Sequence, residues 1–191
     1  MSLTSRLTGK LLGLPPVRTP AVRVIRDLAI PADAGARDNR AIERRADVLT
    51  FTSASLTNDL TVVGPVSTTV HIRSSLTHTD VFARLCDVHP GGRSVNICDG
   101  LVRLHATNVE PDPDGIREAR VEMWPAGHVF RAGHRIRLQL SSGAHPRFNR
   151  NPGTGEPLAT ATEIRAADQE IFHDPQHRTA IYLPVVEEAP S

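Results

Sequence analysis

Apolar and polar residues alternate along much of the chain, which is the pattern of a β-strand with one buried face. In residues 135–140, isoleucine and leucine at the even positions alternate with arginine and glutamine at the odd positions. Residues 60–74 repeat this alternation over a longer stretch. Residues 81–88 are apolar at both parities, which predicts a central strand covered on both faces. Several such short strands separated by turn residues predict an all-β fold of the β-sandwich type.

Turn residues suggest how the strands connect. The sequence Asp-Pro-Asp-Gly at 112–115 is a strong turn signal, and it predicts a hairpin between residues 101–109 and 116–123. Residues 124–140 are then expected to form the next strand pair. Two glycine-containing dipeptides predict a bulge or bend within a strand: Gly64-Pro65 and Asp99-Gly100.

Three stretches suggest helices, and one further stretch suggests a strand. Residues 160–174 place Ile164, Ala167, Ile171 and Phe172 on one side of a helix. The charged connector 36–46 is expected to contain a helical turn with Asp38 as its N-cap. The leucines of residues 2–14 have the spacing of a short amphipathic helix, and residues 21–30 alternate as a strand does.

Composition excludes several classes of function. The 22 basic and 21 acidic residues leave a formal charge of +1, without the basic run or face of a nucleic-acid binder. Apolar runs are too short for a transmembrane helix, and no secretory signal is recognisable at the N-terminus, so we expect a cytoplasmic protein without membrane contacts. One Trp, one Tyr and five Phe are few for a sugar-stacking surface.

The residues give little support for catalysis or for a metal or other cofactor. No Gly-x-Ser-x-Gly elbow occurs, and Ser141-Ser142-Gly143, its nearest imitation, lacks the preceding glycine. We therefore predict no catalytic residue in this chain. The nine histidines show no zinc-binding spacing; His173 and His177 are four apart, but Pro175 between them prevents a shared helical face. No metal site and no cofactor are predicted.

Two cysteines, Cys86 and Cys98, flank the turn of residues 90–93 almost symmetrically. A simple hairpin register would bring their side chains together on adjacent strands. They would then be either a disulfide or redox pair, or two buried free thiols, which a reducing compartment favours.

Residues 122–157, EMWPAGHVFRAGHRIRLQLSSGAHPRFNRNPGTGEP, resemble the C-terminal β-domain of the cocaine esterase and X-Pro dipeptidyl-peptidase (CocE/NonD) family of serine hydrolases. Residues 47–53, 79–104 and 179–186 resemble its opening strand, central hairpin and closing strand, in the same order. The resemblance implies a jelly-roll β-sandwich, galactose-binding-like, with one or two short helices, over residues 36–191.

Residues 21–30 resemble the opening strand of the family's α/β-hydrolase domain, and residues 32–40 resemble the linker ahead of the β-domain. We therefore expect residues 1–35 to be a tail, with the catalytic domain missing from this polypeptide. The resemblance implies a non-catalytic domain that packs on a hydrolase domain and shapes its substrate entrance. The alternative is a stand-alone jelly-roll module that binds a carbohydrate or a protein.

The polar loop of residues 145–155 is the main candidate for a functional surface. The resemblance implies an interface with the hydrolase domain, for which the candidates are Trp124, His145, Arg147, Phe148, Asn149, Arg150 and Asn151. Alternatively, the Arg and Asn side chains hold the loop's own shape. Trp124, Val129 and Phe130 are more in keeping with the core. Without the hydrolase domain, an exposed interface would favour a homo-oligomer.

Overall fold

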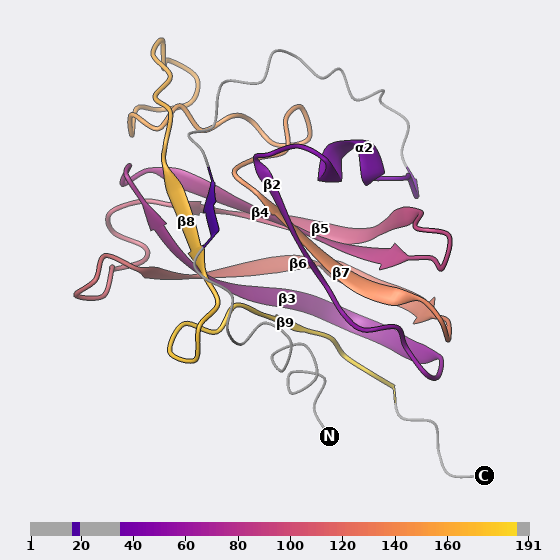
Figure 1. The fold of residues 1–191 in the computed structure, drawn as a ribbon. Helices are drawn as coiled ribbons and strands as arrows, with labels where there is room; N and C mark the ends of the chain where they lie inside the picture. Colours follow the sequence, from indigo (N-terminus) through magenta and orange to yellow (C-terminus); the bar gives the residue numbers. More distant parts are fainter. Residues whose placement is uncertain (1–16, 20–34, 187–191) are drawn as a thin grey trace.

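Two antiparallel β-sheets pack face to face in the computed structural model, which describes residues 17–19 and 35–186 (Figure 1). The predicted helix at 2–14 and the predicted strand at 21–30 lie outside the described residues. The expectation of an all-β sandwich is confirmed.

Each sheet is assembled from strands that are distant in sequence. The five-stranded sheet has the order β1-β8-β3-β6, and β9 also pairs with β3. The four-stranded sheet has the order β2-β7-β4-β5. The strands are β1 (Val17–Thr19), β2 (Val48–Thr52), β3 (Leu60–Ser74), β4 (Thr79–Val88), β5 (Ser94–Leu104), β6 (Arg117–Phe130), β7 (Arg135–Ser141), β8 (Gln169–Phe172) and β9 (Ala180–Tyr182).

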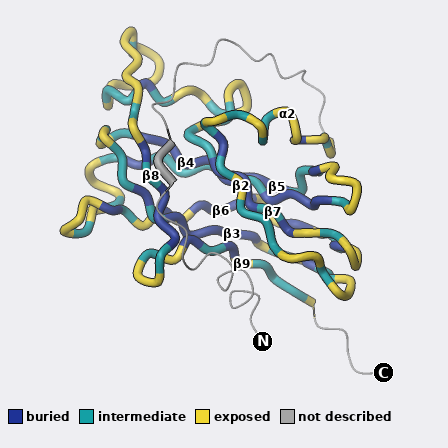
Figure 2. Tube along the Cα trace, viewed as in Figure 1, coloured by how far each residue is buried: buried dark blue, intermediate teal, exposed yellow. Residues whose placement is uncertain are grey.

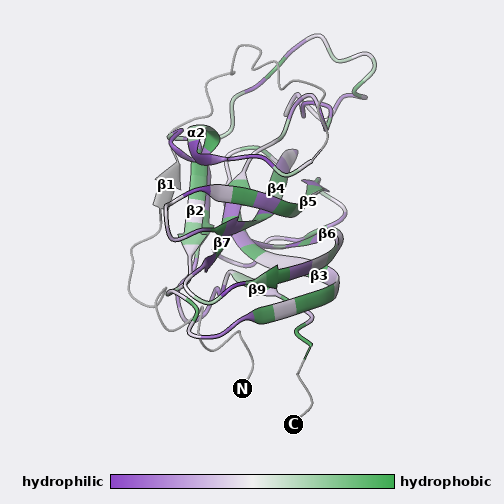
Figure 3. Cartoon of the chain, turned by 90° about the vertical axis from the view of Figure 1, so that its right-hand side faces the viewer, coloured by the Kyte–Doolittle hydropathy of each residue, from purple (hydrophilic) through white to green (hydrophobic). Residues whose placement is uncertain are grey.

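The core lies between the sheets and follows the predicted alternation. Figure 2 shows the strands as mainly buried and the turns as exposed, and Figure 3 shows apolar and polar residues alternating along them. Burying one such aliphatic side chain stabilises the fold by about 1.5–3 kcal/mol. The main contributors include Val66, Val70, Ile72, Val81, Ala83, Leu85, Val121, Phe130, Ile136, Leu138 and Leu140.

Strand β4 is buried along almost its whole length, as its two-sided apolar pattern predicted. Val81, Ala83 and Leu85 face the core. The residues between them face the other side of the sheet, where Phe82 is only 1% exposed. A second layer of chain must therefore cover the outer face of this sheet.

The predicted order of hairpins is only partly right. Strands β4 and β5 form a hairpin, but β5 and β6 belong to different sheets, as do β6 and β7. The turn at 112–115 is present, because Gly115 N–H donates to the Asp112 carbonyl over 2.9 Å. This turn carries the chain from one sheet to the other, since each strand has to bury its apolar face against the opposite sheet.

One predicted bulge is confirmed and the other is displaced. The β3–β6 register shifts between Gly64 and Val66, and Gly64 has φ +133°. In the β4–β5 hairpin the shift falls between Leu85 and Cys86, ahead of the predicted Asp99-Gly100. Gly100 is needed for a different reason, since a Cβ there would lie 2.1 Å from the Glu122 carbonyl oxygen of β6.

This bulge separates the two cysteines. Cys98 pairs with Leu85 and lies in the core, whereas Cys86 pairs with Asn96. The two thiols therefore point to opposite faces of the sheet, contrary to the simple register, and both are buried and free.

The helix predicted over 160–174 is wrong. Residues 160–168 are irregular, and Gln169–Phe172 form β8, which pairs with β1 and β3. Ile171 and Phe172 are buried as strand residues, and Ile164 is 55% exposed. Backbone pairing with β3 outweighs a weak helical preference here.

The predicted helical turn is present as α2 (Arg40–Glu43), but its N-cap residue is Asn39 rather than Asp38. Asp38 lies one residue earlier, and its carboxylate accepts hydrogen bonds from the Arg40 side chain. Asn39 instead is buried, and its side-chain oxygen accepts a hydrogen bond from Arg84 over 2.8 Å.

Residues 37–39 run along the outer edge of β5. Asp38 forms an isolated antiparallel bridge with Val95, and Asn39 N–H donates to the Ser94 carbonyl over 2.7 Å. Asn96 N–H donates to the Arg37 carbonyl over 3.3 Å. This segment thus covers an edge that would otherwise expose unpaired backbone groups.

Candidate functional site

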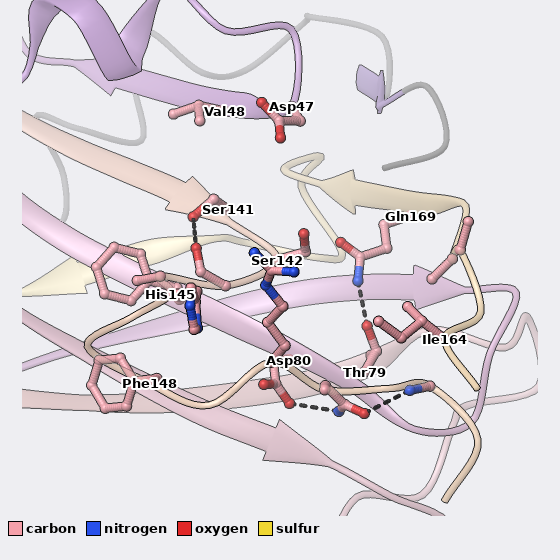
Figure 4. Close-up of a pocket in the computed structure, with 18 of the residues that line it drawn as sticks. Asp47, Val48, Thr79, Asp80, Ser141, Ser142, His145, Phe148, Ile164 and Gln169 are labelled. Carbon is pink, nitrogen blue, oxygen red and sulfur yellow. Dashed lines mark hydrogen bonds between the residues drawn. The ribbon is translucent and has the colours of Figure 1, made fainter. Parts of the chain in front are cut away.

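A pocket of about 220 Å³ lies between the outer face of the four-stranded sheet and the loop of residues 142–168 (Figure 4). Strands β2, β4 and β7 supply the floor, and α2 and β8 add residues at the sides. This loop is the layer that covers the outer face of β4.

The floor of the pocket is apolar. The Phe82 ring lies 6.1 Å from the Phe148 ring of the loop, measured between centroids. Val48 and Ile164 add aliphatic surface from opposite sides (Figure 4). Phe148 therefore anchors the loop by burying one face against the sheet.

An ion pair fixes the loop at one end of β4. The Asp80 side chain is 1% exposed, and Arg103 of β5 donates to both its oxygens over 2.8 Å each. The Asn151 amide donates to the same carboxylate over 2.7 Å, and Arg103 also donates to the Asn149 carbonyl over 3.0 Å. The hydrogen bond to Asp80 raises the pKa of the Arg103 guanidinium, which keeps this group charged.

A second ion cluster fixes the middle of the loop. Arg147 lies 2.8 Å from one oxygen of Asp99, and Arg84 lies 3.3 Å from the other. The Arg84 guanidinium also stacks over the Phe82 ring at 5.0 Å. The loop is thus held by buried charges of the sheet as well as by apolar contact.

Two glutamines add polar groups to the pocket. The Gln169 amide donates to the Thr79 hydroxyl (Figure 4). Gln139 is 1% exposed, and its side-chain oxygen has no hydrogen-bond partner among the described residues. A buried acceptor of this kind is normally satisfied by a donor, so the pocket offers one acceptor to a ligand, a partner or water.

The structure brings most of the predicted surface residues together. His145, Phe148, Asn149, Arg150 and Asn151 line the pocket, and Arg147 joins it through Asp99. Trp124 does not, because it is 66% exposed on the outer face of the other sheet.

The expectation that Trp124 is a core residue is therefore wrong, whereas Phe130 is fully buried. Val121 and Met123 are buried in the core, so the alternation of β6 places Trp124 on the outer face of the sheet.

Sequence reasoning missed the strand residues beneath the loop: Asp80, Phe82, Arg84, Asp99, Arg103 and Gln139. A visible signal existed for two of them, since Asp80 and Arg84 are charged residues within a largely apolar strand. Such residues need partners when they are buried.

The arrangement offers no support for nucleophilic catalysis at Ser141. Its hydroxyl donates to the Gly143 carbonyl over 3.0 Å (Figure 4), so it makes no bond there to a general base.

In the described part of the chain, no helix is long and apolar enough to cross a membrane.

Comparison with known proteins gives one consistent result. The family described as "X-Pro dipeptidyl-peptidase C-terminal non-catalytic domain" matches residues 7–181. The chain is 37% identical over 161 residues to cocaine esterase of Rhodococcus sp. (strain MB1 Bresler), covering 81% of this chain and 28% of that protein.

Solved structures agree with this match. An aminopeptidase from a marine sediment archaeon, Thaumarchaeota archaeon, superposes with a TM-score of 0.71 at 26% identity, covering 78% of this chain and 27% of that one. An α-amino acid ester hydrolase gives a TM-score of 0.72 at 27% identity, covering 79% and 27%. The chain thus spans little more than a quarter of each relative, and by its sequence match and its fold it belongs to the family of X-Pro dipeptidyl-peptidase C-terminal non-catalytic domains.

Proposed function

We propose that this chain packs on an α/β-hydrolase domain of a CocE/NonD-type serine hydrolase, an acyl esterase or X-Pro dipeptidyl-peptidase, and helps to shape its substrate entrance. Residues 36–191 form the packing domain in this proposal, and residues 1–35 lead into it. The observation that carries the proposal is the loop 142–168, which is fixed from beneath by Asp80 and Asp99 and presents its other side to solvent. A surface held in this way is preorganised for docking.

The exposed side of the loop has the composition of an interface. Leu158 is 42% exposed. Ile164 borders the pocket and is still 55% exposed, and the Arg147 and Arg165 side chains are 51% and 60% exposed. Aliphatic groups among arginines are typical of surfaces that bind another protein. Trp124 lies on the opposite face of the sandwich, so a single flat interface cannot include both it and the loop.

A chimera tests the docking proposal. The C-terminal part of the Rhodococcus cocaine esterase is replaced by this chain, and the kcat and KM for ester hydrolysis are measured. We expect an active, soluble enzyme in which Ile164→Asp lowers kcat/KM or separates the two domains. The matched control is Val186→Asp, because Val186 is 48% exposed in an irregular segment beside β3 of the other sheet.

Equal activity of the two chimeric variants would contradict a docking role for the loop face. In the chain alone, size-exclusion chromatography with light scattering reports self-association. We expect Ile164→Asp to reduce any dimer that the exposed face forms.

The chain alone is expected to be inactive as a hydrolase. Labelling with a fluorophosphonate followed by intact mass measurement should give an unmodified mass. A stoichiometric adduct would contradict this, and Ser141 and Ser142 would then be the first sites to map.

The second candidate, a stand-alone ligand-binding module, rests on the pocket and its unpaired Gln139 oxygen. A volume of about 220 Å³ is below the usual range of ligand pockets, about 300–1,000 Å³, which favours docking over ligand storage. Saturable binding on a glycan array, abolished by Gln139→Leu, would favour the module instead.

A further inference from the structure

A cluster of three histidines surrounds the carboxylate of Asp87, at the other end of β4 from Asp80. His134 Nδ1 lies 2.9 Å and 3.1 Å from the two Asp87 oxygens, and His128 Nε2 lies 3.0 Å from one of them. The His89 ring lies 4.4 Å from the His134 ring between centroids, with a tilt of 34°. None of these residues belongs to the pocket.

The fold brings this cluster together from both sheets. Asp87 is the penultimate residue of β4 in the four-stranded sheet, and His128 lies in β6 of the five-stranded sheet. His89 and His134 lie in the β4–β5 and β6–β7 connections, which meet at one end of the sandwich (Figure 1). Asp87 and His89 are close in sequence, but His128 and His134 belong to a distant segment, so no familiar metal-binding motif is visible along the chain.

The Asp87 side chain is only 4% exposed, and a buried carboxylate requires partners. Among the described residues, its side-chain partners are the imidazoles of His128 and His134, with no arginine or lysine.

The separation of the possible ligand atoms is compatible with a metal site. One ligand atom each from Asp87, His89 and His134 can be chosen so that all three lie within 4.8 Å of one another. Two ligand atoms bonded to zinc at about 2.1 Å are about 3.0–3.4 Å apart. The pair formed by Asp87 and His134 already has this separation, whereas His89 would have to move toward that pair, and it lies in the β4–β5 turn.

We propose that Asp87, His89 and His134 bind a divalent transition-metal ion of the zinc class. His128 positions the carboxylate by holding its second oxygen. Two imidazole nitrogens and one carboxylate favour zinc, cobalt or nickel over calcium and magnesium, which prefer sites made of oxygen. His89 and His128 are half-buried, so solvent can complete the coordination. The ion would link the β4–β5 connection to the β6–β7 connection.

Isothermal titration of the tag-free chain with Zn²⁺ tests the proposal, and Ca²⁺ and Mg²⁺ serve as comparison ions. Titration with Co²⁺ gives the coordination geometry from its visible spectrum. We expect one Zn²⁺ per chain, and an affinity at least about ten-fold lower in His89→Gln and in His134→Gln. His105→Gln is the matched control, because His105 lies in a loop away from the cluster and its ring hydrogen-bonds Thr107.

His89→Gln keeps both hydrogen bonds of Asp87 and should therefore fold even where His134→Gln does not. Circular dichroism of each variant verifies folding. Absence of saturable Zn²⁺ binding, or affinity unchanged in folded His89→Gln, would overturn the proposal. An equal loss in His105→Gln would show unspecific histidine binding and would overturn it too.

Discussion

Gly100 provides a sharp test of how the two sheets are packed. A methyl group added there would lie 2.1 Å from the carbonyl oxygen of Glu122 and 3.0 Å from Cα of Met123. The obstructing atoms belong to the backbone of β6, so no side-chain rotation can relieve the overlap. Strands β5 and β6 would have to separate by about 1 Å, which would also loosen the core beneath them.

We expect Gly100→Ala to lower the free energy of unfolding by about 3 kcal/mol, the upper end for overpacked sites. This is a large share of a typical total of about 5–15 kcal/mol. With a urea m-value of about 2 kcal/mol/M, the midpoint should fall by about 1.5 M. Urea unfolding followed by circular dichroism measures the change.

Gly127→Ala is the matched control, because Gly127 also lies in a strand and has open space where its Cβ would be. Its midpoint should stay unchanged or rise, since alanine reduces the entropy of the unfolded chain. An unchanged midpoint for Gly100→Ala would refute the close backbone contact between β5 and β6.

Three further predictions concern charge and thiols. Arg103→Leu should lower the free energy of unfolding by about 2–4 kcal/mol, because Asp80 stays buried and keeps the Asn151 amide as its side-chain partner among the described residues. Arg120→Leu, which breaks an exposed pair, should change it by less than about 1 kcal/mol. Denaturant unfolding compares the two variants, and equal effects would contradict the role of the Asp80 pair. Burial raises the pKa of the Cys86 and Cys98 thiols from 9.0 to about 12, so the free energy of unfolding should keep their full contribution below pH 9 and fall as the pH rises from 9 toward 12. Both thiols should react with Ellman's reagent only on unfolding, and rapid reaction of the native chain would disprove their burial. The hydrogen bond between His177 and Asp174 raises the pKa of His177 above 6.5. The stability that this bond adds is therefore present below pH 6.5 and is lost as the pH rises through the folded-state pKa of His177. NMR titration should show the raised pKa, and Asp174→Asn should lower the pKa of His177.

The local sequence pattern predicted features that depend on a single strand. It failed where pairing with a distant segment decides the structure. Strand β3 has the predicted limits, because its apolar residues Val66, Val70 and Ile72 share one face and pack in the core. Residues 160–174 satisfy a helical pattern, but Ile171 and Phe172 are buried equally well in a strand, and pairing with β3 decides between them. The bulge at Leu85 and Cys86 could not be foreseen either, although it reverses the relation of the two cysteines.

The same limit applies to the prediction of the candidate site. The loop residues were identifiable from their composition, whereas the carboxylates that hold them come from β4 and β5, distant in sequence. A charged residue within a two-sided apolar strand is the one signal that points to such a partner. It indicates that a partner exists, without saying which segment supplies it.

The cover over β5 has a practical consequence for expressing this domain. Residues 37–39 precede every strand of the four-stranded sheet, so a fragment that begins at Arg40 would retain β2 to β9 and lose the cover. The Ser94 carbonyl and the Asn96 N–H would then be free to pair with another molecule. Such a fragment should precipitate or form ordered aggregates at concentrations at which a fragment beginning before Arg37 stays monodisperse. Three residues outside the sandwich strands thus set the shortest usable fragment.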